Sequence, residues 1–173
     1  MLELYCGDGK GKTTACVGLA VRAAGHDIPV IFAQFMKNNH SGEITILQGI
    51  PQIQVMHTEV FYGFVKDMNT RQKEEMKLHN TKLVQEIERK IRASQQEFMV
   101  VILDEVLHAC HKNLLDETLL YHLLDACTPN IEIVFSGKHP SKELCRRADY
   151  ISEIHKIKHP FDQGIAARKG IEL

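Results

Sequence analysis

A glycine-rich segment near the N-terminus carries the residue types that bind phosphate. It reads Gly7-Asp8-Gly9-Lys10-Gly11-Lys12-Thr13-Thr14 and lies between an apolar run and a helical pattern. Glycines let backbone N–H groups turn toward phosphate oxygens, and the helix start adds partial positive charge. Lys12 supplies a full charge, and Thr13 a hydroxyl for Mg²⁺. Because three residues separate Gly7 from Gly11, where the usual pattern has four, the usual γ-phosphate placement is not expected.

A pair of carboxylates follows the most apolar segment of the chain. Phe98–Leu103 is six consecutive apolar residues, typical of a strand buried on both faces, and Asp104 and Glu105 follow directly. Ligands of parallel sheets bind at the carboxyl ends of strands, so these carboxylates are expected across from Thr13. There they can hold Mg²⁺ (or Mn²⁺), directly or through water. The alternative, a pair of capping or surface carboxylates, is less favoured beside a phosphate loop.

Other groupings of metal-binding or nucleophilic residues are weaker. Glu105 and His108 have the spacing of half a di-iron motif, but the sequence has no second Glu-x-x-His. His108, Cys110 and His111 lack a spaced partner pair for zinc, so ordinary helix residues are expected there. No spacing among Ser, Cys and His residues indicates a nucleophilic triad.

The elements that must position these residues alternate between strand and helix. Strands are predicted at Leu2–Cys6, Pro29–Phe35, Ile53–His57, Phe98–Leu103 and Ile131–Phe135, with an edge strand at Tyr150–Ile154. Helices are predicted at Thr13–Ala24, Ile44–Leu47, Thr70–Gln96, Leu114–Ala126 and Ser141–Ala148. This alternation predicts an α/β fold, a P-loop NTPase-like three-layer sandwich with a mostly parallel central sheet of about five to six strands. Because no repeat or low-complexity linker interrupts the chain, residues 1–173 are expected to form a single domain.

Composition narrows the classes of partner. The net charge is −1 over 173 residues, which argues against binding of nucleic acid or an acidic membrane by bulk electrostatics. Five cysteines without a C-x-x-C pair suit free thiols in a reducing compartment. No apolar run approaches the length of about 18 residues that spans a bilayer, and the N-terminus does not resemble a signal peptide. A cytoplasmic protein is therefore expected, with neither membrane nor nucleic acid as a partner.

Three further stretches, taken with the phosphate loop, resemble the P-loop class of ATP:cob(I)alamin (corrinoid) adenosyltransferases. They are Gln34–Lys37, Leu103–Val106 and the tail Lys158–Glu172, so that the resemblance runs from about Leu4 to Glu172. It implies an alkyl-group transferase that moves the 5′-deoxyadenosyl group of ATP to Co(I) of a reduced corrinoid and releases triphosphate. The family binds ATP reversed relative to ordinary P-loop enzymes, so the shortened loop grips the leaving triphosphate.

The resemblance also implies roles for single residues. The triphosphate contacts are Gly7, Asp8, Gly9, Lys10, Gly11, Lys12, Thr13, Thr14 and Lys138. The catalytic residues are Lys10, Lys12 and Phe64. Mg²⁺ is held by Thr13 and Glu105, with Asp104 orienting or bonding through water.

Three departures from the family pattern stand out. The family's Gly-Phe-Thr-Trp reads Gly63-Phe64-Val65-Lys66, so Phe64 and Lys66 are the candidates for the corrin face. Its Thr-Gly-Arg reads Ser136-Gly137-Lys138, which keeps a cation without the bidentate fork. Some members have an N-terminal segment that covers the site, and this chain is expected to lack it.

The partners implied are ATP, the reduced corrinoid, a Co(II) reductase such as a flavoprotein, and a second copy in a homodimer. Two other functions stay open. One is a P-loop kinase or NTPase that acts at the γ-phosphate, which would need a loop of normal length. The other is a nucleotide- or corrinoid-binding protein without turnover.

Overall fold

The structure is a computed structural model that describes residues 1–37 and 41–171. In this part of the chain six strands form one sheet in the order β3-β2-β4-β5-β1-β6, and every neighbouring pair is parallel. The strands are β1 (Leu2–Cys6), β2 (Val30–Gln34), β3 (Ile53–His57), β4 (Met99–Asp104), β5 (Ile131–Ser136) and β6 (Tyr150–Glu153). All six predicted strands are therefore confirmed, including the edge strand β6.

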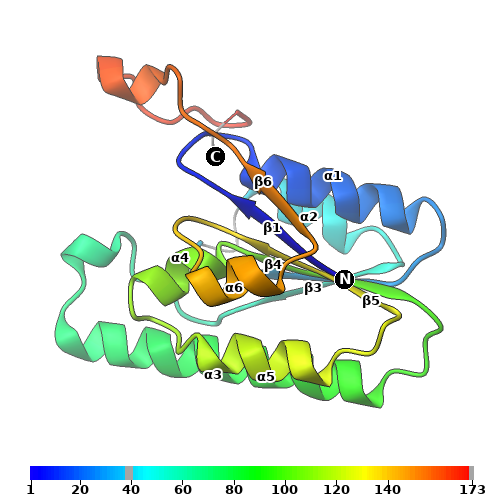
Figure 1. Cartoon of the computed structure of the whole chain (residues 1–173). Coiled ribbons are helices and arrows are strands. Elements are labelled where there is room, and N and C mark those ends of the chain that lie inside the picture. The colour runs from blue at the N-terminus through cyan, green and yellow to red at the C-terminus, as the bar shows by residue number, and fades with distance from the viewer. Residues whose placement is uncertain (38–40, 172–173) are drawn as a thin grey trace.

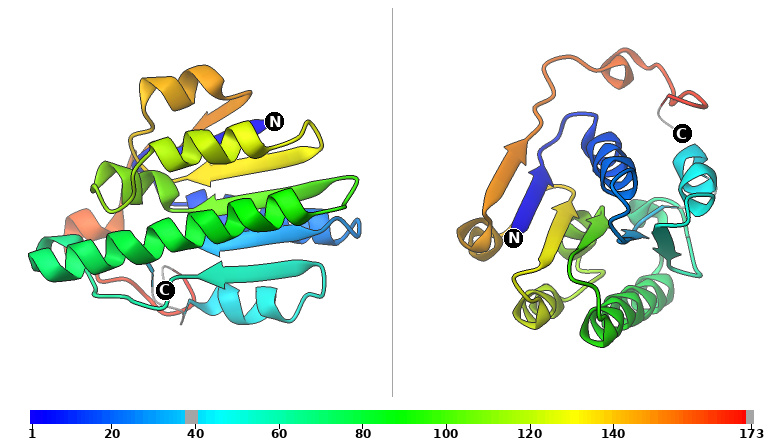
Figure 2. Two further views of the ribbon diagram at one scale, coloured as in Figure 1. Left: turned by 90° about the horizontal axis from the view of Figure 1, so that it is seen from below. Right: turned by 90° about the vertical axis from the view of Figure 1, so that its right-hand side faces the viewer.

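Helices cover both faces of the sheet (Figures 1 and 2). One face is covered by α1 (Lys12–Ala24) and α2 (Gly42–Gln48). The other is covered by α3 (Thr70–Ala93), α4 (Val106–His111), α5 (Thr118–Ala126) and α6 (Lys142–Arg147). Short 3₁₀ helices lie at Val65–Asp67 and Pro160–Gln163. The three-layer α/β sandwich predicted from the alternation is confirmed.

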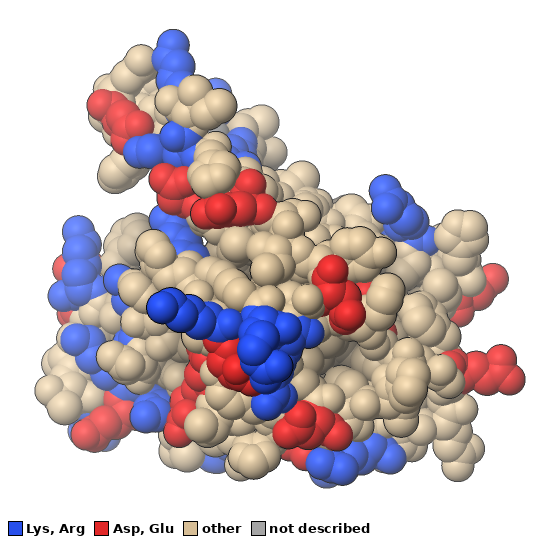
Figure 3. All heavy atoms as spheres, viewed as in Figure 1, with Lys and Arg blue, Asp and Glu red and all other residues tan. Residues whose placement is uncertain are grey.

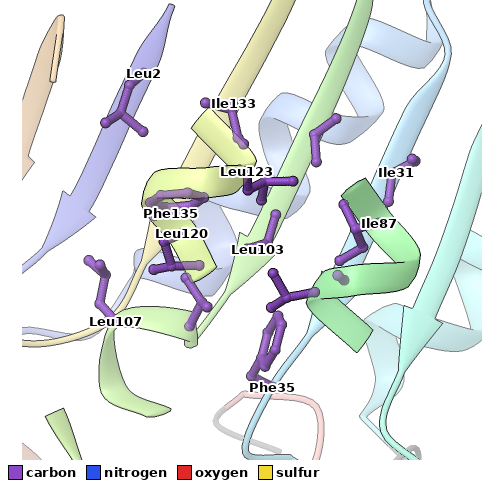
Figure 4. Packing of buried hydrophobic residues seen from close by; sticks show 14 of the residues in the cluster. Leu2, Ile31, Phe35, Ile87, Leu103, Leu107, Leu120, Leu123, Ile133 and Phe135 are labelled. Atoms are coloured by element: carbon purple, nitrogen blue, oxygen red, sulfur yellow. The ribbon is translucent and has the colours of Figure 1, made fainter. Parts of the chain in front are cut away.

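The larger core lies between the sheet and α3–α6. Figure 4 shows strand side chains such as Leu103 and Phe135 facing Ile87 of α3 and Leu120 of α5. The whole of β4 is buried, because sheet neighbours flank it and helices cover both of its faces. The strand that leads to the two carboxylates is thus enclosed along its whole length.

The helices differ from the prediction in the start of α5 and in the presence of α4. The helix expected from Leu114 begins at Thr118, because the Asp116 carboxylate accepts a hydrogen bond from the Thr118 N–H and so defines the first turn. Leu114 and Leu115 are buried loop residues whose apolar character mimics a helix face. The short helix α4, directly after the carboxylates, had no predicted range, although His108, Cys110 and His111 within it were expected to be ordinary helix residues.

The C-terminal tail leaves β6 and extends away from the body of the molecule (Figure 1). Lys, Arg, Asp and Glu side chains are interspersed over the face shown in Figure 3, as the balanced composition suggests. None of the helices in the described part of the chain is both long and apolar enough to cross a membrane. Glu172, the last residue of the tail that resembles the family, lies outside the described residues.

Candidate active site

The phosphate loop joins β1 to α1 at the carboxyl edge of the sheet. Gly11 precedes the helix with a φ of 124°, a conformation that favours glycine. Within residues 1–37 and 41–171 no side chain caps this helix end, so the first-turn N–H groups are left for an anion. The Lys12 ammonium donates to the carbonyl oxygens of Gly7 and Gly9, at 2.9 Å each. Burial lowers the pKa of Lys12, and the nearby Glu105 charge opposes this shift.

The other side of the loop packs against the chain that follows β6. The Gly9 N–H donates to the Ile154 carbonyl oxygen at 2.8 Å. A Cβ at Gly7, where φ is 100°, would lie 2.4 Å from that same oxygen, so only glycine fits. The exposed Asp8 carboxylate accepts a hydrogen bond from the Lys156 N–H at 3.0 Å, which lowers the pKa of Asp8. Asp8, predicted to contact triphosphate, therefore anchors the start of the tail.

Asp104 is the centre of the hydrogen-bond network. Its side chain is fully buried. The Ser136 hydroxyl donates to Oδ1 at 2.6 Å, and the Thr13 hydroxyl lies 3.1 Å from both carboxylate oxygens. The Gln34 amide and the Lys37 ammonium donate to Oδ2 at 3.3 and 3.1 Å. The structure thus brings Thr13 and Asp104 together as predicted.

Gln34, Lys37 and Ser136 had no role assigned from the sequence. Gln34 is the last residue of β2 and lies directly beside Asp104 in the parallel register. Ser136 ends β5, the strand on the other side of β4. Gln34 and Ser136 are each a polar residue at the end of an otherwise apolar buried strand, and this pattern could have indicated that they belong to the site.

Glu105 occupies the turn between β4 and α4. Its φ is 62°, a left-handed conformation uncommon outside glycine, and its N–H donates to the Ser136 hydroxyl at 2.9 Å. Burial raises the pKa of the Glu105 carboxyl, and the Asp104 charge adds to this, while Lys37, Lys12 and Lys138 oppose it. The charges of Lys138 and Glu105 both act on the Lys12 ammonium as well. The two predicted residues therefore lie close to the phosphate loop.

The remaining predicted phosphate contacts are exposed: Lys10 lies in the loop and Thr14 in the first turn of α1. Phe64 and Lys66 lie elsewhere, on the segment that follows β3. Phe64 is 76% exposed, and the Lys66 ammonium lies 5.8 Å from the centre of its ring. β3 and β1 are four strand positions apart in the sheet, which corresponds to about 19 Å. Phe64 and Lys66 thus follow a different strand from the phosphate loop, at the same carboxyl edge of the sheet.

The oxygen atoms around Asp104 suit a divalent cation. Hard cations such as Mg²⁺ prefer carboxylate and hydroxyl oxygens. The Lys37 ammonium already lies between Thr13 Oγ1, at 2.8 Å, and Asp104 Oδ2, so this position accepts positive charge. Among the residues that the structure describes, no group of three His, Cys, Asp or Glu side chains forms a complete metal cage. A metal here would need further oxygen ligands, which a nucleotide's phosphates can supply.

Comparison with solved structures supports the fold. The ATPase 2 and 3 region of EssC from Geobacillus thermodenitrificans matches with a TM-score of 0.54 at 15% identity over 99% of this chain. The cytoplasmic domain of EssC matches with a TM-score of 0.53 at 16% identity over 96% of this chain. In each case the match spans 35% of the larger protein, so it indicates the P-loop NTPase-like fold alone.

Comparison of sequences identifies the family. The chain is 30% identical to the corrinoid adenosyltransferase of Escherichia coli K12 and 31% identical to CobA of Salmonella typhimurium. Each match covers 99% of this chain and 85% of the relative. The corrinoid adenosyltransferase of Pseudomonas aeruginosa is 28% identical over all of this chain and 83% of its own length. The family model for ATP:corrinoid adenosyltransferases of the BtuR/CobO/CobP type matches residues 1–173. The chain therefore belongs to the corrinoid adenosyltransferases, enzymes that transfer an adenosyl group from ATP to a corrinoid.

Proposed function

We propose that the protein transfers the 5′-deoxyadenosyl group of ATP to Co(I) of a reduced corrinoid and releases triphosphate, with Mg²⁺ (or Mn²⁺) as cofactor. The electron pair of Co(I) forms the bond to C5′ while the C5′–O bond breaks, and that bond's electrons leave with the triphosphate. The observation that carries the proposal is the positive charge of Lys12, Lys37 and Lys138 around a shortened phosphate loop.

Stabilising the leaving triphosphate is the main task of these residues. The three ammonium groups and the uncapped N–H groups of α1 offer preorganised positive charge at one edge of the sheet. No general base is required, because Co(I) is itself the nucleophile. Catalysis then consists of positioning and electrostatics, for which the rigid strand ends of β1, β2, β4 and β5 are suited.

The metal would be held by Thr13, Asp104 and Glu105. When bound, a divalent cation supplies charge neutralisation to the phosphate oxygens. The direct contact between Thr13 and Asp104 favours Asp104 as the nearer carboxylate, although the family resemblance favours Glu105 as the direct ligand. Both carboxylates stay in the proposed site.

The corrinoid is proposed to lie beside Phe64. The Phe64 segment is anchored by the buried Met68, while Phe64 itself stays exposed and free to contact a flat ring. Packed under the corrin, the apolar Phe64 ring would exclude both water and the displaced lower ligand of cobalt. The ring cannot form a hydrogen bond with either of them. Lys66 can cover the ring with its aliphatic stem while its ammonium reaches solvent.

Two protein partners complete the proposal. A reductase such as a flavoprotein would deliver Co(I), and a second copy would form a homodimer in the cytoplasm. The exposed edge strand β6, with Tyr150 and Ile151 about half exposed, supports a contact of this kind. Sedimentation measurements that give only the monomer mass at working concentration would exclude the homodimer.

One assay tests the reaction. The protein is incubated with ATP, Mg²⁺ and chemically reduced cobalamin, and the phosphate product is identified. Triphosphate formed only with the corrinoid supports the proposal. Orthophosphate or pyrophosphate formed without the corrinoid would indicate a kinase or NTPase acting at other phosphate bonds. Binding of ATP or corrinoid without any product would indicate a protein without turnover.

A further inference from the structure

Lys37 occupies the position that the proposed metal ion would also take. It follows β2, and its ammonium contacts Thr13 Oγ1 at 2.8 Å and Asp104 Oδ2 at 3.1 Å. These are two of the atoms proposed to hold the metal. The preceding residue, Met36, has a φ of 59°, a left-handed conformation uncommon outside glycine. Met36 and Val65 both pack against the buried cluster of Met68, Met76 and Leu114, so this cluster supports both the turn and the Phe64 segment.

An ammonium group and a divalent cation exclude each other at this position. The ammonium has three donors and no lone pair, so it cannot serve as a metal ligand. Two positive charges at such short range repel strongly inside a protein, where the screening by water is weak. Asp104 is fully buried, and Lys37 is the cation that neutralises it in the structure. A metal that binds Thr13 and Asp104 must therefore displace Lys37.

A second acidic residue offers Lys37 another place. The Lys37 ammonium lies 3.8 Å from the Glu43 carboxylate of α2, which also accepts a hydrogen bond from Gln34. The Lys37 side chain is 28% exposed, which leaves it room to move. Displaced from Asp104, the ammonium can lie between Glu43 and the negatively charged phosphates of a nucleotide.

We propose that Lys37 competes with free divalent metal for Thr13 and Asp104, so that the metal enters the site together with ATP. A metal ion that binds alone displaces the Lys37 ammonium from Asp104 without bringing it a new negative partner. Metal with ATP also brings negative phosphates, which take over as partners of the ammonium. Lys37 thus orders the binding of the two ligands. This inference rests on the metal site proposed above.

The test compares metal binding with and without nucleotide, in the absence of corrinoid, so that no transfer occurs. Mn²⁺ alone is titrated into the protein, and free Mn²⁺ is followed by electron paramagnetic resonance. Preformed Mn²⁺·ATP is then titrated and followed by calorimetry. The variants are Lys37→Met, which removes the charge at similar length, and Lys37→Arg, which keeps it. Lys82→Met, an exposed lysine on α3, is the matched control.

Lys37→Met should bind Mn²⁺ alone at least tenfold more tightly than the wild type, and Mn²⁺·ATP more weakly. Lys37→Arg and Lys82→Met should stay within about threefold of the wild type for Mn²⁺ alone, because each keeps a cation beside Asp104. A folded Lys37→Met variant that binds Mn²⁺ alone no more tightly than the wild type would overturn the inference.

A further variant covers the case in which Lys37→Met does not fold. Glu43→Gln keeps Lys37 and removes its second partner, so it should weaken binding of Mn²⁺·ATP at least threefold without tightening binding of Mn²⁺ alone. Unchanged Mn²⁺·ATP binding by this variant would also contradict the inference. If the wild type fails to bind Mn²⁺·ATP at all, the proposed metal site fails, and the role of Lys37 with it. If the wild type binds Mn²⁺·ATP normally and only the variants miss their predictions, the proposed function stands without the Lys37 competition.

Discussion

Replacing Asp104 by Asn tests whether its buried charge holds the site together. The variant Asp104→Asn keeps the shape of the side chain but exchanges one acceptor oxygen for an NH₂ donor. In the structure four groups converge on the two oxygens: the hydroxyls of Thr13 and Ser136, the Gln34 amide and the Lys37 ammonium. The new amide would therefore face at least one donor and leave Lys37 without its closest negative partner.

The loss of stability in Asp104→Asn depends on how deeply Asp104 and Lys37 are each buried. Removing one partner of a fully buried pair costs about 3–5 kcal/mol. Asp104 is fully buried, but Lys37 is 28% exposed and water can solvate its ammonium. We therefore expect Asp104→Asn to lower the free energy of unfolding by about 2–3 kcal/mol. For a chain of this size, that corresponds to a fall in Tm of about 4–12 °C.

Thermal unfolding followed by circular dichroism, in buffer without metal or nucleotide, measures the change directly. Asp67→Asn, at an exposed aspartate in the short 3₁₀ helix after Phe64, serves as the control and should stay within about 0.5 kcal/mol of the wild type. An unchanged or raised Tm for Asp104→Asn would refute the reasoning, because it would mean that the converging donors do not depend on the carboxylate charge.

Three other predictions concern activity and pH. Lys12→Ala should lower kcat at saturating ATP about a hundredfold, because a hydrogen-bond donor to the charge that develops in the transition state is worth about 3 kcal/mol. Normal turnover by this variant would exclude the phosphate loop from catalysis. Phe64→Ala should leave Tm unchanged, since the ring is exposed, and should lose most activity when Co(II) must be reduced in the site but much less with excess Co(I). Equal losses in the two assays would contradict a role in removing the lower ligand. Burial lowers the pKa of His108 to about 4, so the unfolded chain takes up this proton first and stability should fall as pH decreases from about 6.5 toward 4. His108→Gln should flatten that part of a Tm–pH profile, whereas the exposed His122→Gln should not.

The sequence predicted what depends on local patterns. The phosphate loop, with Lys12 and Thr13, is a contiguous motif, and Asp104 was located because it ends a long apolar strand. The partners of Asp104 depend instead on strand order. Lys37 and Ser136 reach Asp104 because β2 and β5 flank β4, and periodicity indicates strands without their order.

The contact of Asp8 with Lys156 was unpredictable for a related reason. The two residues are far apart in the sequence and meet only because β1 and β6 are neighbours in the sheet. The late start of α5 was missed because Leu114 and Leu115 continue an apolar pattern that packing, and not helix formation, explains.

The placement of β1 has a consequence for synthesis on the ribosome. β1 is made before the other five strands of the sheet, yet its two neighbours, β5 and β6, are made after β2, β3 and β4. Gly9 donates a hydrogen bond to the carbonyl of Ile154, about 145 residues later in the chain. At ordinary translation speed, synthesis of that stretch takes roughly 7–30 s. Until then the nascent chain carries an unpaired strand edge, which is a site for aggregation. Its phosphate loop is also incomplete, so ATP cannot yet stabilise the fold by binding there. The phosphate loop is therefore made before most of the sheet but can be completed only after β6 and Ile154 have been synthesised.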